Sequence, residues 1–184
     1  AEGAVEDTKK NFQFLISNQF QSPNQTSTSS VGTGQANSKF FVSDVREIAT
    51  HLEKQSVDAI VTEPYLGPPL TGKESSVLLG KTRRDVQALV TDAFAVFAKV
   101  LRPNGRVVMV FPVYQRSDLN TTEVRPHALL PIDGIEKLGW RLVHNDIPRA
   151  ESRGDRNGLT SRNTILYSRD DQHLAREITV WERV

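Results

Sequence analysis

The chain contains no cysteine, and this absence excludes several kinds of chemistry at once. Without cysteine there is no disulfide framework, no thiol nucleophile and no cysteine-ligated zinc site. We also expect no metal site, because the histidines lack the spacing of metal ligands; they are His51, His127, His144 and His173. A serine-centred triad is equally unsupported, since the sequence has no Gly-x-Ser-x-Gly motif.

Long hydrophobic runs and a strong net charge are absent as well. No apolar stretch approaches the roughly 20 residues that cross a bilayer, and the first ten residues lack the basic and apolar regions of a signal peptide. A net charge of +1 over 184 residues argues against a strongly basic nucleic-acid-binding arm, although a local basic face is still compatible with it. The absence of a membrane span and of a signal peptide predicts a cytoplasmic protein. The length of the chain predicts a single domain over residues 1–184.

Strand and helix patterns alternate along the chain and predict an α/β fold. Helical spacing of apolar residues occurs at 5–20, 45–55, 82–101 and 128–138. Strand patterns occur at 39–43, 57–61, 106–111, 140–144, 164–167 and 177–181. Residues 21–38 are almost all Ser, Thr, Gln, Asn and Gly, which predicts a flexible polar loop. We therefore expect a Rossmann-like, mostly parallel sheet flanked by helices, with a C-terminal antiparallel hairpin.

The most informative segment follows the predicted strand 57–61, where an apolar run gives way to Glu63, Pro64 and Tyr65. Ligands bind at the carboxyl ends of strands in open α/β sheets. A carboxylate beside a proline and a flat ring could hold a planar polar group, such as a base with an exocyclic amine. The alternative is an ordinary strand-to-loop turn that carries an acidic residue by chance.

Asp44 ends the preceding predicted strand, so we expect it at the same sheet edge as Glu63. Two carboxylates at neighbouring strand ends suit the recognition of an amino group or of ribose hydroxyls. Asp44 could instead cap the helix that follows it, and the two roles are compatible. The four arginines within 149–162 favour a solvated loop of mixed charge, with contact to a nucleic-acid backbone as the alternative.

Taken together, these segments resemble the C-terminal two-thirds of a class I S-adenosylmethionine-dependent methyltransferase. The resemblance is greatest to the transfer-RNA guanine-N2 methylases, whose catalytic (Asp/Asn)-Pro-Pro-Tyr signature reads Thr62-Glu63-Pro64-Tyr65 here. It covers nearly the whole chain. The matching segments are 57–61 with the family's fourth strand, 41–45 with its third-strand motif, 101–108 with the start of its fifth strand, and 139–143 with 176–178 near the end.

This resemblance implies methyl transfer from S-adenosylmethionine to an exocyclic amine, most closely guanine N2 of a transfer RNA. It assigns catalysis to Glu63, Pro64 and Tyr65, and cofactor binding to Asp44, Val45 and Thr62. No metal is implied. A DNA adenine-N6 methyltransferase is the alternative within the class, because the same tetrapeptide grips either amine. The implied partner is therefore RNA, with no membrane and an undetermined oligomeric state.

Two departures from the family pattern stand out. The acidic residue is a glutamate in Thr-Glu-Pro-Tyr, and the Gly-rich first motif that holds the methionine end of the cofactor is absent. Because residues 4–11 resemble the helix after the second strand, we expect a domain that lacks its first two strands. A non-catalytic binding module is then a rival interpretation, and calorimetric titration with S-adenosylmethionine distinguishes the two.

Overall fold

The computed structural model describes residues 13–18, 37–114, 129–144, 158–169 and 172–184. The chain divides into two compact units, Ala1–Asp44 and Val45–Val184, and each is described by itself. The predicted flexible loop at 21–38 falls outside the described residues except for its last two positions, which belong to a strand. The prediction of one domain over 1–184 stays a prediction.

The first unit contains an antiparallel hairpin of β1 (Gln13–Asn18) and β2 (Asn37–Val42). Its register sets Phe14 opposite Phe41 and Leu15 opposite Phe40. The helix predicted for 5–20 is therefore wrong over the residues of β1. Aromatic and apolar residues in a short segment fit a strand as well as a helix, and pairing with β2 decides between them.

The second unit is built on a six-stranded mixed sheet with the order β3-β4-β8-β7-β6, and β5 also pairs with β8. The strands are β3 (Val57–Thr62), β4 (Leu101–Tyr114), β5 (Trp140–Val143), β6 (Gly158–Leu159), β7 (Ile165–Tyr167) and β8 (Leu174–Arg183). Strands β3 and β4 pair in parallel, and every other pairing in this sheet is antiparallel. The fold is α/β, as predicted.

The expected mostly parallel sheet is wrong, because strand β8 occupies the centre. It runs against β4 along one edge and against both β5 and β7 along the other. Strands β3, β4, β5 and β7 nevertheless share one direction, since each is related to β8 through these pairings. The antiparallel hairpin predicted for the last two strands, β7 and β8, is confirmed. Strand β8, reversed relative to the strands beside it, thus accounts for three of the four antiparallel pairings in this sheet.

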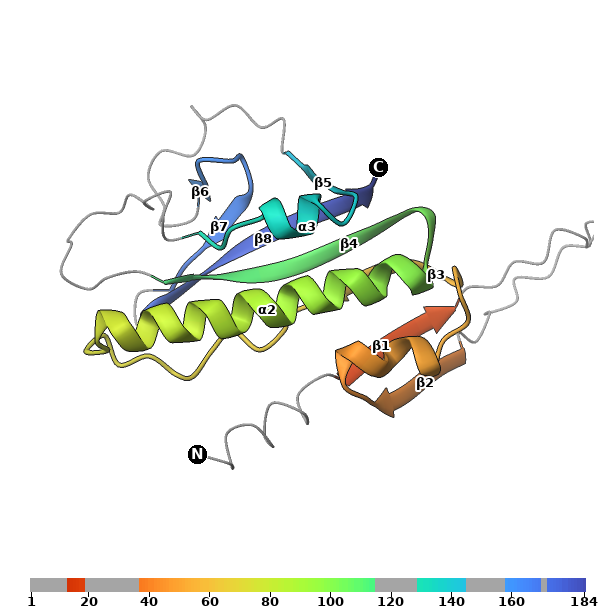
Figure 1. Cartoon of the computed structure of the whole chain (residues 1–184), viewed down its shortest axis with the longest axis horizontal. Helices are drawn as coiled ribbons and strands as arrows, with labels where there is room; N and C mark the ends of the chain where they lie inside the picture. The colour runs from red at the N-terminus through yellow and green to blue at the C-terminus, as the bar shows by residue number, and fades with distance from the viewer. Residues whose placement is uncertain (1–12, 19–36, 115–128, 145–157, 170–171) are drawn as a thin grey trace, which may run out of the picture. The chain divides into compact units, whose positions relative to one another are not determined.

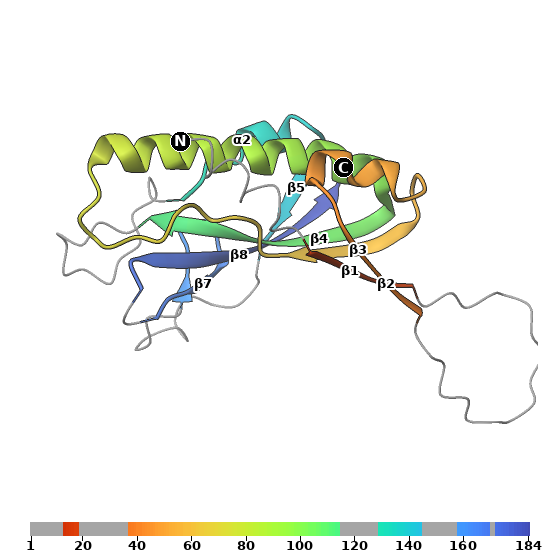
Figure 2. The ribbon, with the colours of Figure 1, turned by 90° about the horizontal axis from the view of Figure 1, so that it is seen from below.

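Helix α2 (Ser76–Val100) joins β3 to β4 and covers one face of the sheet (Figures 1 and 2). The predicted helix at 82–101 is confirmed, and it begins earlier, where the Ser75 side chain accepts a hydrogen bond of 3.2 Å from the Leu78 N–H. Its buried face centres on Phe94, whose ring meets those of Trp140 and Trp181 edge to face. This aromatic cluster packs the helix onto the sheet.

The other helices are shorter than their patterns predict. Residues 45–55 give only the 3₁₀ helix η1 (Val45–Thr50), and the pattern at 128–138 gives only α3 (Asp133–Glu136). Asn104 adopts φ 64°, as expected for the turn between α2 and the apolar part of β4. In the described residues, no helix is long and apolar enough to cross a membrane.

The sheet face away from α2 carries a row of apolar residues beside a row of charged ones, Arg106, Glu182 and Arg141. Cross-strand register places Val61, Val108, Val180 and Val143 in one row on this face, and the Val61 side chain is 76% exposed. Among the described residues, the helices lie on the opposite side (Figure 2).

Candidate functional site

One edge of the sheet gathers the residues singled out by the sequence. Because β3 and β4 are parallel, their carboxyl ends point to the same edge, and the antiparallel β8 begins there, with Leu174 opposite Tyr114. In Figure 1 the end of β4 and the start of β8 lie together on the left. Glu63, Pro64 and Tyr65 follow β3 toward this edge. We call it the carboxyl edge.

Glu63 meets a guanidinium at the carboxyl edge. The Nε–H of Arg176, on β8, donates to Glu63 Oε1 over 2.8 Å, and the Nη1 group of Arg176 donates to Gln172 Oε1 over 2.6 Å. The Glu63 side chain is 48% exposed and that of Arg176 is 26% exposed. The carboxylate is thus held from the protein side while it still faces solvent.

Pro64 is buried and Tyr65 is half-buried, so the two residues after Glu63 anchor it to the protein. Burial raises the pKa of the Tyr65 hydroxyl above 10.0, and the nearby Asp85 carboxylate raises it further. Tyr65 is therefore a neutral phenol at neutral pH, as a tyrosine with an ordinary pKa also is. A neutral aromatic ring beside an exposed carboxylate is suited to stacking on a flat heterocycle.

Tyr114, the last residue of β4, ties the loop after Tyr65 to the sheet. Its buried hydroxyl donates a 2.9 Å hydrogen bond to the carbonyl of Leu66. Burial raises the pKa of Tyr114, Tyr65 adds to the increase, and the Arg83 guanidinium opposes it. Gly67 lies against the same hydroxyl with φ 106°. The backbone immediately after Tyr65 is therefore fixed from two sides.

Glu74 closes the loop just before α2. Its Oε1 accepts from the backbone N–H of Thr71 over 2.5 Å and from the Thr71 hydroxyl over 2.8 Å, while Oε2 accepts from the Gly72 N–H over 3.0 Å. These bonds, with those from Thr71 first in importance, lower the pKa of Glu74 from 4.5 to about 2. Gly72 lies beside the His173 ring, which brings this part of the loop to the start of β8.

The residues predicted to bind a cofactor are distributed over both units. Thr62 ends β3, and Val45 is buried at the start of η1 in the same unit. Asp44 is the last residue of the first unit and is half-buried. Because the two units are described separately, a shared edge for Asp44 and Glu63 stays a prediction.

Sequence reasoning missed Arg176, Gln172 and Tyr114. Arg176 lies 113 positions from Glu63 in the chain, and only the placement of β8 beside β4 brings the two together. Tyr114 sits just past the apolar run 106–111 that marks β4, so the extent of that strand was the one available signal.

The arginine-rich segment 149–162 is described only at its end. Arg162 is not on a solvated loop, which is the arrangement that the sequence favours: its side chain is 16% exposed, and its Nε donates to Glu177 Oε1 over 2.6 Å. Its Nη1 group also donates to the Leu130 carbonyl over 3.0 Å. Arg162 is thus part of the packed interior. The other three arginines lie outside the described residues.

Among the described residues, no group of three histidine, aspartate or glutamate side chains could hold a metal ion. The exposed carboxylate at the carboxyl edge is bound by an arginine instead. The chemistry available there is that of a hydrogen-bond acceptor next to an aromatic ring.

Neither protein-family models nor curated proteins match this chain. Several solved structures are similar to it. A candidate DNA modification methylase from Thermus thermophilus matches with TM-score 0.41 and 17% identity in its complex with S-adenosyl-L-methionine, over 77% of this chain and 51% of that protein. A second structure of the same protein gives TM-score 0.38 and 18% identity, over 77% of this chain and 52% of that protein.

A candidate exported protein from Bordetella parapertussis is similar over 77% of this chain and 43% of its own, with TM-score 0.35 and 12% identity. The matched part of this chain thus spans about half the length of the solved structures or less. Likeness at this level leaves the reaction to be argued from the chain's own residues.

Proposed function

We propose that this chain methylates an exocyclic amine on a nucleobase, with S-adenosylmethionine as the methyl donor and guanine N2 of a transfer RNA as the favoured target. The observation that carries the proposal is the placement of Thr62-Glu63-Pro64-Tyr65. This tetrapeptide, similar to the amine-gripping signature of these methylases, ends a strand of a βαβ unit and presents an exposed carboxylate beside a half-buried ring.

The proposed reaction depends on the position of the substrate amine more than on a strong acid or base. An exocyclic amine is a poor nucleophile because its lone pair is conjugated with the ring. Hydrogen bonds from the amine N–H groups to the Glu63 carboxylate and to the Pro64 carbonyl localise that lone pair on nitrogen. Tyr65 stacks on the base, a contact worth roughly 1–3 kcal/mol. Holding the nitrogen in line with its target supplies much of the acceleration.

When bound, S-adenosylmethionine supplies a methyl group on a positively charged sulfur. The amine nitrogen would accept that methyl group and would then lose one proton to water. Glu63 stabilises the positive charge that develops on the nitrogen before this proton departs. The residues of this chain thus orient and stabilise the amine through the whole step.

The chain fits the proposed cofactor in part. Asp44 offers a half-buried carboxylate that could accept from the adenine amine, and Thr62 offers a hydroxyl at the strand end. The sequence contains no Gly-rich first motif to hold the methionine end of the cofactor. The cofactor-binding roles of Asp44 and Thr62 therefore stay separate predictions, one for each unit.

The test is methyl incorporation by the 184-residue chain, measured at high S-adenosylmethionine concentration with a transfer-RNA transcript and with duplex DNA, followed by nucleoside analysis. We expect N2-methylguanosine from the RNA. Substituting Glu63→Gln keeps the side-chain size but removes the charge, and it should lower the rate by roughly 100-fold.

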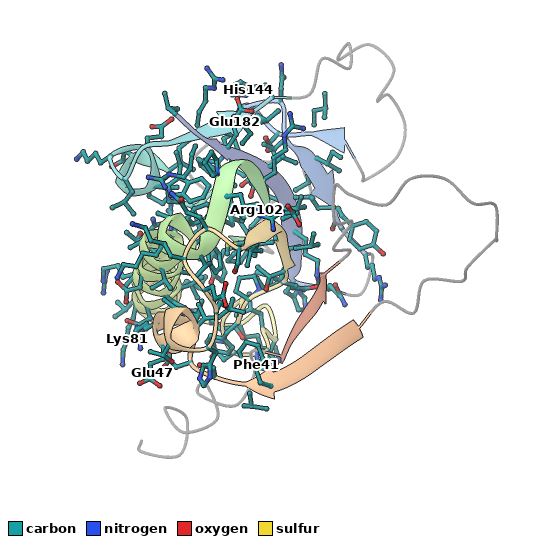
Figure 3. The ribbon with its side chains drawn as sticks, turned by 90° about the vertical axis from the view of Figure 1, so that its right-hand side faces the viewer. Phe41, Glu47, Lys81, Arg102, His144 and Glu182 are labelled. Carbon is teal, nitrogen blue, oxygen red and sulfur yellow. The ribbon has the colours of Figure 1, made fainter. Side chains whose placement is uncertain are left out.

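Glu182→Gln is the matched control, because Glu182 (labelled in Figure 3) is also a carboxylate paired with arginine but lies near the opposite end of β8 from Arg176, where it faces Arg106. It should leave the rate unchanged. Formation of N6-methyladenine in DNA, with no product in RNA, would show that the DNA alternative is the correct one. Unchanged methylation by the Glu63 variant, or no methylation of either nucleic acid, would overturn it.

A further inference from the structure

Arg176 is a candidate for a role that the sequence did not suggest. It lies in the middle of the sheet, because β8 pairs with β4 on one side, where Arg176 faces Pro112, and with β7 on the other, where it faces Tyr167. Gln172 accepts from its Nη1 group over 2.6 Å. The backbone of Arg176 is thus paired on both sides, and its guanidinium is held by the Gln172 side chain.

This fixed guanidinium engages one half of the Glu63 carboxylate. Arg176 Nε donates to Oε1, and Oε2 accepts no hydrogen bond within the described part of the chain. A carboxylate has about four lone-pair sites over its two oxygens, so one oxygen is held while the other is available to a ligand.

The pair is poorly explained as a device for stability. Ion pairs exposed to solvent contribute little to folding, and the Glu63 side chain is about half exposed. A glutamate also has several rotatable bonds, so an exposed one without a partner would sample many orientations. The contact with Arg176 removes that freedom at the residue where orientation matters for the proposed reaction.

We infer that Arg176 is a positioning residue for Glu63: it binds Oε1 so that Oε2 faces the substrate amine. This inference rests on the proposed function and deepens it. Lysine is not an equivalent replacement, because it lacks the planar donor set and the fixed geometry of the guanidinium.

The experiment compares Arg176→Gln and Arg176→Lys with wild type in the 184-residue chain, using transfer RNA as substrate. We expect kcat to fall roughly 10- to 100-fold for Arg176→Gln, with the KM for RNA unchanged within about twofold, because displacing a catalytic group costs rate rather than binding. Arg176→Lys should be only partly active. Arg141→Gln is the control, since Arg141 makes a similar contact of 3.0 Å to Glu182 and should match wild type.

A second measurement does not depend on activity. The Arg176 Nε–H resonance should be visible and slow to exchange with water in wild-type protein, and it should shift and exchange rapidly in Glu63→Gln. Thermal unfolding of each variant shows whether it is folded. If Arg176→Gln fails to fold, Arg176→Lys and this resonance decide the matter.

The outcomes separate the two ideas. Wild-type kcat in Arg176→Gln, together with an inactive Glu63→Gln, would overturn the positioning role and leave the proposed function standing. A raised KM with unchanged kcat would show that Arg176 contacts the RNA instead. An Nε–H resonance that does not respond to Glu63→Gln would show that Arg176 does not bind Glu63 in solution. Full activity of Glu63→Gln would overturn the proposed function.

Discussion

Single residues set the geometry of the carboxyl edge, and Gly67 is an example because no side chain fits at its position. It follows the Glu63-Pro64-Tyr65 segment and has φ 106°, in a region that residues with a Cβ rarely adopt. A Cβ there would lie 2.7 Å from Thr82 Cγ2 and 3.2 Å from the Tyr114 hydroxyl oxygen. Only the structure shows that Thr82 of α2 and Tyr114 of β4 close around Gly67.

Gly67→Ala should therefore destabilise the protein by roughly 1–3 kcal/mol, through backbone strain and displacement of Thr82. Gly80 lies within α2, where a Cβ would meet only Arg84 Nη1 at 3.6 Å. Gly80→Ala should stabilise the protein by about 0.5–1 kcal/mol, because alanine favours the helix. Urea unfolding of both variants measures the two effects. Equal stabilities would contradict this account of Gly67.

At the scale of elements, the sequence predicted best the helices and strands whose pattern of apolar residues is long or continuous. Helix α2 has a long buried face, so its periodicity is clear, and β3 shows as an apolar run, although only Val57 and Ile60 of it are buried. The short helices η1 and α3 were predicted too long, and β1 was read as a helix. One or two turns carry too few apolar positions to fix a period, so tertiary contacts determine their limits.

Glu74, in the loop between β3 and α2, should make the stability of the protein depend on pH. Glu74 has a pKa of about 2 in the folded protein, below its ordinary value of 4.5. Its contribution to stability is therefore fully present above pH 4.5 and is lost as the pH falls toward 2. Wild type should be more stable than Glu74→Gln near pH 6, and the difference should shrink on acidification. Unfolding free energies from pH 6 to pH 2 test this, and a constant difference would refute it.

The whole second unit depends on contacts between segments that are distant in sequence. Strand β8 is central in the sheet although it comes last, and on it the carboxylate of Glu177 is fully buried. Glu177 binds Arg162 and the Thr164 hydroxyl, and Arg162 reaches the Leu130 carbonyl. The segments around 130 and 162 are thereby joined to the centre of the sheet.

Removing one member of this buried pair should be costly. Glu177→Gln leaves the Arg162 guanidinium without its counter-charge and should destabilise the protein by roughly 3–5 kcal/mol. Glu182→Gln, on the same strand but in a more exposed ion pair, should cost much less. Replacing both members, as Arg162→Met with Glu177→Leu, should recover most of the loss, because no charge is then left buried. Chemical denaturation gives all three values, and a double variant as unstable as the single one would contradict this.

The sequence by itself determined the α/β class, the helix α2, the strand β3 and the Glu63-Pro64-Tyr65 segment at its end. These depend on local order, where apolar periodicity and strand-end chemistry can be read directly. The tertiary structure alone decided that β8 lies between strands running the other way, that Tyr114 fixes the loop, and that Arg176 meets Glu63. Such neighbours follow from which surfaces the whole chain can bury together, and that is not written in any one segment.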